Sequence, residues 1–144
     1  MNSKRQRVVI VPCSGIGKSL GTVSREAAYE LCDNLRPDGT QLVALSKLVL
    51  GDEQARERVR SSLAITIDGC KQMCASKLVK HNGGRVSRAV AVFESFRNHK
   101  NLKPEGIAEL NEEGLQLARV LAEEIAVEID EILKAGVVEG GPHA

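Results

Sequence analysis

The sequence predicts an α/β protein, a three-layer, Rossmann-like domain with a mostly parallel sheet of about four strands and a long C-terminal helix. Three observations predict this fold class. Short aliphatic runs alternate with segments of helical periodicity, which is typical of strands joined by right-handed helical crossovers. The chain has one Tyr, two Phe and no Trp, so its core is aliphatic and suits a sheet buried on both faces. The last long segment has an apolar stripe at helical spacing.

The first half of the chain predicts two pairs of a strand and a helix. Residues 7–12 are a continuous apolar run that ends in a Gly-rich stretch, as expected for a buried strand followed by a loop. Thr22 or Ser24 is a suitable N-cap for a helix that extends to about Leu35. The next elements in chain order are a strand over 41–46 and a charged, mostly solvated helix over 52–63.

The second half continues this alternation. Its elements are a strand over 63–68, a helix from Cys70 to about His81, and a strand over 86–93. The segment 111–135 predicts one long helix, and its apolar stripe is wider than one sheet face requires. Core packing is one interpretation of that width, and a helix shared between two copies of the chain in a homodimer is the other.

Length and composition narrow the class of protein. We expect a single domain over 1–144, in which 7–110 hold the sheet and its helices, 111–135 the long helix and 136–144 a flexible tail. The chain has 20 Lys and Arg residues and 19 Asp and Glu residues. The basic residues do not form a stripe interleaved with aromatic residues, so we expect no nucleic-acid partner. No apolar run approaches the roughly 18 residues that span a bilayer. The polar start predicts no signal peptide, so we expect a cytoplasmic protein.

Four cysteines need an explanation in a cytoplasmic protein, because stable disulfides are rare there. Cys13 directly follows the first strand and Cys70 follows the third after Gly69, so both are expected at the edge where parallel strands end. Cys74 would share one face of the first helical turn with Cys70 if that helix starts near Cys70. Free amides at a helix start favour the thiolate. Three sulfur atoms are therefore predicted to meet at one edge of the sheet.

The same edge suggests a zinc site. Zn²⁺ takes four tetrahedral ligands in a structural site, and three protein ligands plus water or substrate in a catalytic one. The candidate ligands are Cys13, Cys70 and Cys74. Ser46, which ends the second predicted strand on this edge, is a candidate for the fourth or a neighbouring position, as is water or a substrate atom. Cys32 lies well down the first helix and predicts a thiol packed in the core.

The Gly-rich loop after the first strand has a second interpretation. It ends like a phosphate-binding P-loop, except that Pro12 replaces the first glycine and lacks the backbone N–H that the phosphate cradle needs. Backbone amides and one ammonium group could still bind an anion beside the first cysteine. The candidate anion-binding residues are Ser14, Gly15, Gly17 and Lys18.

The chain resembles the DGC-domain family, which is named for an Asp-Gly-Cys motif. The resemblance lies in Asp68-Gly-Cys70, in Cys74-Ala-Ser-Lys77, in Cys13-Ser-Gly15 and in the segment 21–28. It implies that Cys13, Cys70 and Cys74 fall on positions proposed to chelate zinc. The family's remaining cysteine usually closes the second strand, where this chain has Ser46. The resemblance implies no particular reaction.

Three functional hypotheses follow. The leading one is a zinc-binding protein with a thiolate-rich site, in which Asp68 orients the loop or supports the ligands from outside. The first alternative is a thiol-dependent redox or sulfur-transfer enzyme, with Cys13 as nucleophile activated by Lys18 and the helix start, and Cys70 or Cys74 as resolving thiol. The second is a phosphate- or nucleotide-binding α/β domain with incidental cysteines. An unidentified small molecule or anion is the expected partner.

Overall fold

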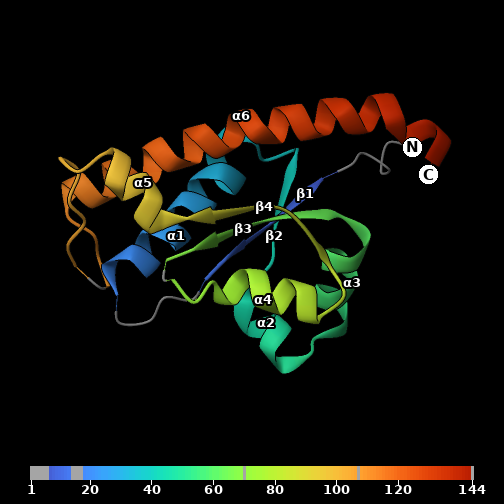
Figure 1. The fold of residues 1–144 in the computed structure, drawn as a ribbon, viewed down its shortest axis with the longest axis horizontal. Coiled ribbons are helices and arrows are strands. Elements are labelled where there is room, and N and C mark those ends of the chain that lie inside the picture. Colours follow the sequence, from blue (N-terminus) through green and yellow to red (C-terminus); the bar gives the residue numbers. More distant parts are fainter. Residues whose placement is uncertain (1–6, 14–17, 70, 107, 144) are drawn as a thin grey trace.

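The computed structural model describes residues 7–13, 18–69, 71–106 and 108–143, with side chains up to Ala135. It confirms the predicted α/β class, with four parallel strands and a long C-terminal helix (Figure 1). The strands are β1 (Val8–Pro12), β2 (Thr40–Leu42), β3 (Leu63–Asp68) and β4 (Arg85–Ala91). The helices are α1 (Ser19–Tyr29), η2 (Glu30–Leu35), α2 (Leu45–Leu50), α3 (Glu53–Ser61), α4 (Cys74–His81), α5 (Val92–Asn98) and α6 (Glu112–His143).

The strand order β2-β1-β3-β4 determines where ligands can approach the sheet. From β1 the chain adds β2 on one side and then crosses to place β3 on the other side. The strand order therefore reverses between β1 and β3, and in open parallel sheets ligands bind outside the carboxyl ends of the strands at such a point. Cys13 follows β1 and Gly69 follows β3, so both segments leave the sheet there.

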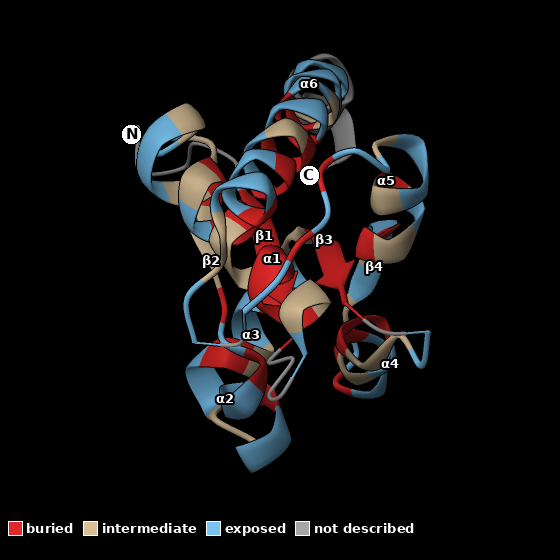
Figure 2. Ribbon diagram, turned by 90° about the vertical axis from the view of Figure 1, so that its left-hand side faces the viewer, coloured by how far each residue is buried: buried red, intermediate tan, exposed pale blue. Residues whose placement is uncertain are grey.

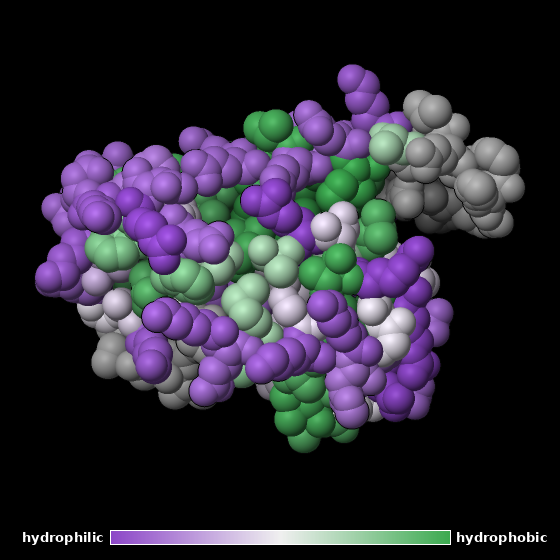
Figure 3. Space-filling view, viewed as in Figure 1, coloured by the Kyte–Doolittle hydropathy of each residue, from purple (hydrophilic) through white to green (hydrophobic). Residues whose placement is uncertain are grey.

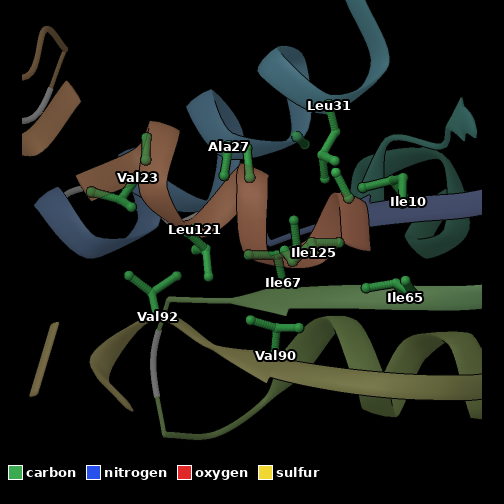
Figure 4. Packing of buried hydrophobic residues seen from close by; sticks show 14 of the residues in the cluster. Ile10, Val23, Ala27, Leu31, Ile65, Ile67, Val90, Val92, Leu121 and Ile125 are labelled. Atoms are coloured by element: carbon green, nitrogen blue, oxygen red, sulfur yellow. The ribbon is translucent and has the colours of Figure 1, made fainter. Parts of the chain in front are cut away.

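The sheet lies between two layers of helices, as Figure 2 shows. The central strands β1 and β3 are buried on both faces, whereas most of the edge strand β4 is exposed. Side chains alternate along β1: Val8 and Ile10 pack toward α1 and α6, and Val9 and Val11 toward α2, α3 and α4. The buried side chains thus form one cluster on each face of the sheet. Figure 4 shows the cluster on the face where α1, η2 and α6 meet the strands. This α6-side cluster includes Val8, Ile10, Val23, Ala27, Leu31, Ile65, Ile67, Leu121 and Ile125. The α4-side cluster is Val9, Val11, Cys13, Val43, Leu45, Leu48, Ala55, Val59, Ala64, Ala75 and Val79.

The first helix begins earlier than its sequence predicts. Thr22 and Ser24 are not its caps: α1 starts at Ser19, and both side chains are buried inside the helix. The hydroxyl of Ser24 donates to the carbonyl of Gly21 at 2.6 Å, a bond within the helix rather than a cap. The predicted end at Leu35 is correct, but the last six residues form the π-helix η2.

The strand predicted over 41–46 is wrong in its second half. β2 ends at Leu42, and α2 begins at Leu45 and includes Ser46 in its first turn. Leu45 and Leu48 are buried in the α4-side cluster at helical spacing, and this burial favours a helix where the sequence resembled a continuing strand. Ser46 is exposed on α2 instead of ending a strand.

The third helix and the fourth strand also differ from prediction at one end. α4 begins at Cys74 instead of near Cys70, so the two cysteines do not share its first turn. β4 ends at Ala91, two residues before the predicted end, and the chain continues directly into α5. Phe93 therefore lies in a helix just beyond the carboxyl end of β4.

The long helix α6 covers one face of the sheet. Its apolar stripe, including Leu117 and Leu121, is mostly buried in the α6-side cluster, whereas Leu115 and Val127 are exposed. The helix continues to His143 instead of ending near residue 135. In Figure 3 its visible outer surface is mostly hydrophilic, and an apolar patch lies lower, over α2. None of the described helices has both the length and the apolar character that crossing a bilayer requires.

Candidate metal centre

Cys13 is held at the carboxyl end of β1 by the sheet itself. Its backbone N–H donates to the carbonyl of Ile67 at 2.9 Å and so extends the β1–β3 ladder one residue past the end of β1. The residue is buried, with only 4% of its surface exposed. The backbone position of this thiol is therefore fixed by strand pairing rather than by a loop.

The sulfur of Cys13 contacts both segments beside it. It accepts a hydrogen bond from the backbone N–H of Gly69 at 3.1 Å, and it lies 3.5 Å from the hydroxyl oxygen of Ser24 in α1. Ser24 also reaches the carbonyl of Cys13 at 3.3 Å. The thiol group is thus connected to the loop after β3 and to the second turn of α1.

Gly69 makes this approach possible because it has no side chain. A Cβ at this position would lie 2.7 Å from both the Cα and the N of Gly21 in α1. These are backbone atoms, which cannot rotate away as a flexible side chain could. Glycine at position 69, facing glycine at position 21, therefore allows the loop after β3 to pack directly on α1.

Asp68 connects the end of β3 to the start of α4. Its side chain is fully buried, and one carboxylate oxygen accepts from the N–H of Ala75 at 2.7 Å. The other accepts from the N–H of Ser76 at 3.3 Å and from its hydroxyl at 3.2 Å. Asp68 thus caps α4 from seven residues earlier in the chain. The hydroxyl of Thr66 in β3 lies 2.6 Å from that of Ser76 and adds to this network.

The cap places Cys74 at the first position of α4. Met73 before it has a left-handed φ of 55°, a conformation uncommon outside glycine that tertiary contacts must maintain. The Cys74 side chain is half-buried and packs against the α4-side cluster, which contains Cys13. Two of the three candidate thiols therefore belong to one packed region at the carboxyl edge of the sheet.

The remaining candidates are only partly covered by the structure. Cys70 lies outside the described residues, as do Ser14, Gly15 and Gly17. Among the described His, Cys, Asp and Glu side chains, no group of three or more lies close enough to hold a metal ion. Cys70 is not among these residues, so the three-thiolate set stays a prediction.

Ser46 shares a small cavity with Cys13, although it does not end a strand. The cavity has a volume of about 160 Å³. Its described lining is Pro12, Cys13, Arg25, Tyr29, Leu42, Ala44, Leu45 and Ser46. A group at the Cys13 side of this space would therefore face α2, the helix that carries Ser46.

Cys32 lies on the opposite face of the sheet. It is half-buried in η2 and packs against the α6-side cluster, whereas Cys13 belongs to the α4-side cluster. Burial raises the pKa of the Cys32 thiol above 9.0, and a hydrogen bond with Thr40 opposes this effect. Cys13 and Cys32 are free thiols. Cys32 is thus separated from the candidate centre by the sheet.

Sequence reasoning missed three polar residues at this edge of the sheet, which are Lys71, Gln72 and Ser24. Lys71 and Gln72 line a second, larger cavity with Lys18 at the carboxyl edge of the sheet. The rule that places Cys13 and Cys70 after strand ends applies equally to these neighbours and could have identified them. Ser24 was missed because only the folded helix shows that its hydroxyl faces Cys13.

Comparison with known proteins gives one match. A family model described as DGC domain matches residues 9–114. This range includes Cys13, the Asp68-Gly-Cys70 segment and Cys74. No curated protein and no solved structure matches the chain.

Proposed function

Since the chain belongs to the DGC-domain family, we propose that it is a cytoplasmic zinc-binding protein whose ligands include Cys13, Cys70 and Cys74. One observation carries the proposal. Gly69, the residue before Cys70, donates its N–H to the sulfur of Cys13, while Asp68 caps the helix that begins at Cys74. Asp68 and Gly69, the two residues that precede Cys70 in the sequence, thus contact Cys13 and the start of the helix that carries Cys74.

The chemistry of these groups fits zinc. Thiolates are preferred ligands of Zn²⁺, and metal-bound sulfur commonly accepts backbone N–H hydrogen bonds that orient it, as Gly69 would do for Cys13. Asp68 accepts three hydrogen bonds from α4, so its role is to position Cys74 rather than to bind the metal. Only Gly fits at position 69 without displacing α1.

Three thiolates leave one position of a tetrahedral site for another ligand. Ser46 lines the same cavity as Cys13 and is a candidate neighbour of that position, with water or a substrate atom as alternatives. Zinc with an exchangeable fourth ligand acts as a Lewis acid and lowers the pKa of bound water. The surrounding chain would hold the sulfur atoms and restrict access to this position.

Cobalt substitution tests the ligand set directly. Co²⁺ bound to thiolates absorbs in the near ultraviolet through sulfur-to-metal charge transfer, and tetrahedral geometry gives visible bands. We expect these bands in the intact protein and a loss of charge-transfer intensity in Cys70→Ser and Cys74→Ser. Cys32→Ser is the matched control because its thiol lies on the other face of the sheet, and it should retain the full spectrum. Equal spectra in all variants, or no bands in the intact protein, would contradict the proposal.

A thiol-dependent redox or sulfur-transfer enzyme is the second candidate, because Cys13 borders a cavity and its sulfur already accepts a backbone N–H. In that case Cys13 would alkylate much faster than Cys32 without any chelator, and mild peroxide would join it to Cys70 or Cys74. Slow alkylation that accelerates only after chelation favours zinc. Mass mapping of the alkylated peptides distinguishes the two functions.

A further inference from the structure

A cavity of about 450 Å³ lies beside the candidate metal centre and is lined in part by Gly69, whose N–H donates to the sulfur of Cys13. Its described lining is Lys18, Leu20, Gly69, Lys71, Gln72 and Phe93. These residues come from the segments that follow β1, β3 and β4, so the cavity lies at the carboxyl edge of the sheet, where ligands of open parallel sheets bind. Its volume is within the usual range for small-molecule sites.

The polar groups of the cavity favour a negatively charged ligand. Lys18 precedes α1 and Lys71 follows β3, so two ammonium groups from separate segments border one space. No acidic side chain is among the described lining residues. Within the described part of the chain, none of the ion pairs involves either lysine. The positive charge of this cavity is therefore available to a ligand.

The walls of the cavity favour a ligand that also has an apolar part. Leu20 and Phe93 are half-buried and contribute aliphatic and aromatic surface. The guanidinium of Arg97 lies 5.8 Å from the centre of the Phe93 ring, which helps to hold that ring in place. A water molecule takes about 30 Å³ of liquid, so the cavity volume corresponds to many water molecules. A free phosphate ion, which has only five heavy atoms, would fill a small part of it.

We propose that this cavity binds a small amphiphilic anion, a phosphate, sulfonate or carboxylate group attached to a ring-sized apolar body. Lys18 and Lys71 bind the anionic group, and Leu20 and Phe93 contact the apolar body. Gln72 supplies a further hydrogen-bonding group. Gly69 lines this cavity and donates its N–H to the sulfur of Cys13, so the ligand would lie next to the candidate metal centre, while its own contacts are with residues that are not metal ligands.

Titration of the full chain with phenyl phosphate, followed by amide NMR, tests this proposal. We expect saturable shifts at Leu20, Gly69 and Gln72, and an affinity about tenfold higher than for inorganic phosphate or for phenol alone. Lys18→Ala and Lys71→Ala should each weaken binding about three- to tenfold, and added salt should weaken it further. Phe93→Leu should reduce the preference for phenyl phosphate over inorganic phosphate.

The controls separate this site from other causes of binding. Lys80→Ala removes an exposed lysine from the last turn of α4 and should leave the affinity unchanged. The titration is run on the protein as purified and again after chelator treatment, and binding should persist in both. Binding that needs the metal and ignores the lysine variants would place the anion on zinc and overturn the proposal. Equal affinity for phosphate and phenyl phosphate would overturn it as well.

Discussion

The backbone N–H of Gly69 donates to the sulfur of Cys13 at 3.1 Å, and this bond joins the two segments that leave the sheet at its switch point. The contact connects residues far apart in sequence, and it depends on the missing side chain at position 69. Cys70 is the next residue in the sequence after the donor of this bond. The proposed metal site depends on this arrangement.

Gly69→Ala should therefore damage both the fold and the site. The new Cβ would lie 2.7 Å from backbone atoms of Gly21, so α1 or the loop must shift. We expect a loss of about 1–3 kcal/mol in the free energy of unfolding, measured by urea denaturation, and weaker zinc binding. Gly39→Ala is the control, because its Cβ would meet only the terminal methyl of Leu133 at 2.9 Å. If both variants bind zinc equally well, the Gly69–Cys13 contact has no part in the site.

Asp68→Ala should loosen the start of α4. The buried N–H groups of Ala75 and Ser76 would lose their acceptor, which should cost about 2–3 kcal/mol in the free energy of unfolding. Because Cys74 begins this helix, zinc affinity should also fall roughly 10- to 100-fold in a competition titration with a chromogenic chelator.

The matched control is Asp52→Ala. Asp52 caps α3 by accepting from the N–H of Ala55 at 2.9 Å, so its loss should cost about 1 kcal/mol. Since α3 carries no candidate ligand, zinc affinity should not change. Equal losses of affinity in the two variants would mean that general destabilisation, rather than the position of Cys74, explains the effect.

Ser46→Cys tests the neighbour of the fourth ligand position. Ser46 and Cys13 line one cavity, so a thiolate at position 46 could complete a four-thiolate site. We expect tighter zinc binding. We also expect added thiols to bind more slowly to Co²⁺ in the site, a reaction that is monitored through the absorption of the Co²⁺. Unchanged affinity would show that α2 holds position 46 too far from the metal.

The ion pair between Arg36 and Asp130 predicts a loss of stability in acid. Arg36 donates two hydrogen bonds of 2.7 Å to the carboxylate, which lowers the pKa of Asp130 below 3.8. The pair therefore stabilises the fold above the unfolded-state pKa, and this contribution is lost as the pH falls through the folded-state pKa. The Arg36 side chain is 34% exposed and that of Asp130 is 53% exposed, so solvent screens the pair and its contribution at neutral pH is at most about 1 kcal/mol.

Asp130→Asn isolates this contribution. The difference in unfolding free energy between the parent protein and the variant should be present near neutral pH and vanish near pH ~2. Glu131→Gln removes one charge from the same helix at a residue without an ion pair in the described structure, and it should show no such pH-dependent difference. A difference for Asp130→Asn that stays constant with pH would contradict the assignment.

The sequence predicts the sheet better than the edge where the chemistry lies. The bounds of β3 match because Leu63–Asp68 is an aliphatic run with clear ends, and a buried parallel strand needs little else. The start of α4 was misplaced because Asp68 caps it from a distance, which no local pattern reveals. The segment with Ser46 is predicted wrongly because residues 42–45 are a short continuous apolar run, which periodicity alone cannot assign to a strand or to a helix.

Native mass spectrometry of untagged protein, purified without chelators or nickel, tests the central claim most directly. We predict a mass of the chain plus about one zinc ion, no zinc in Cys70→Ser, and full zinc in Cys32→Ser. The same spectrum gives the oligomeric state, which distinguishes the two interpretations of the apolar stripe of α6, core packing within one chain and a helix shared in a homodimer. A natively folded chain that carries no zinc, or a zinc ion that survives Cys70→Ser, would contradict the proposed site.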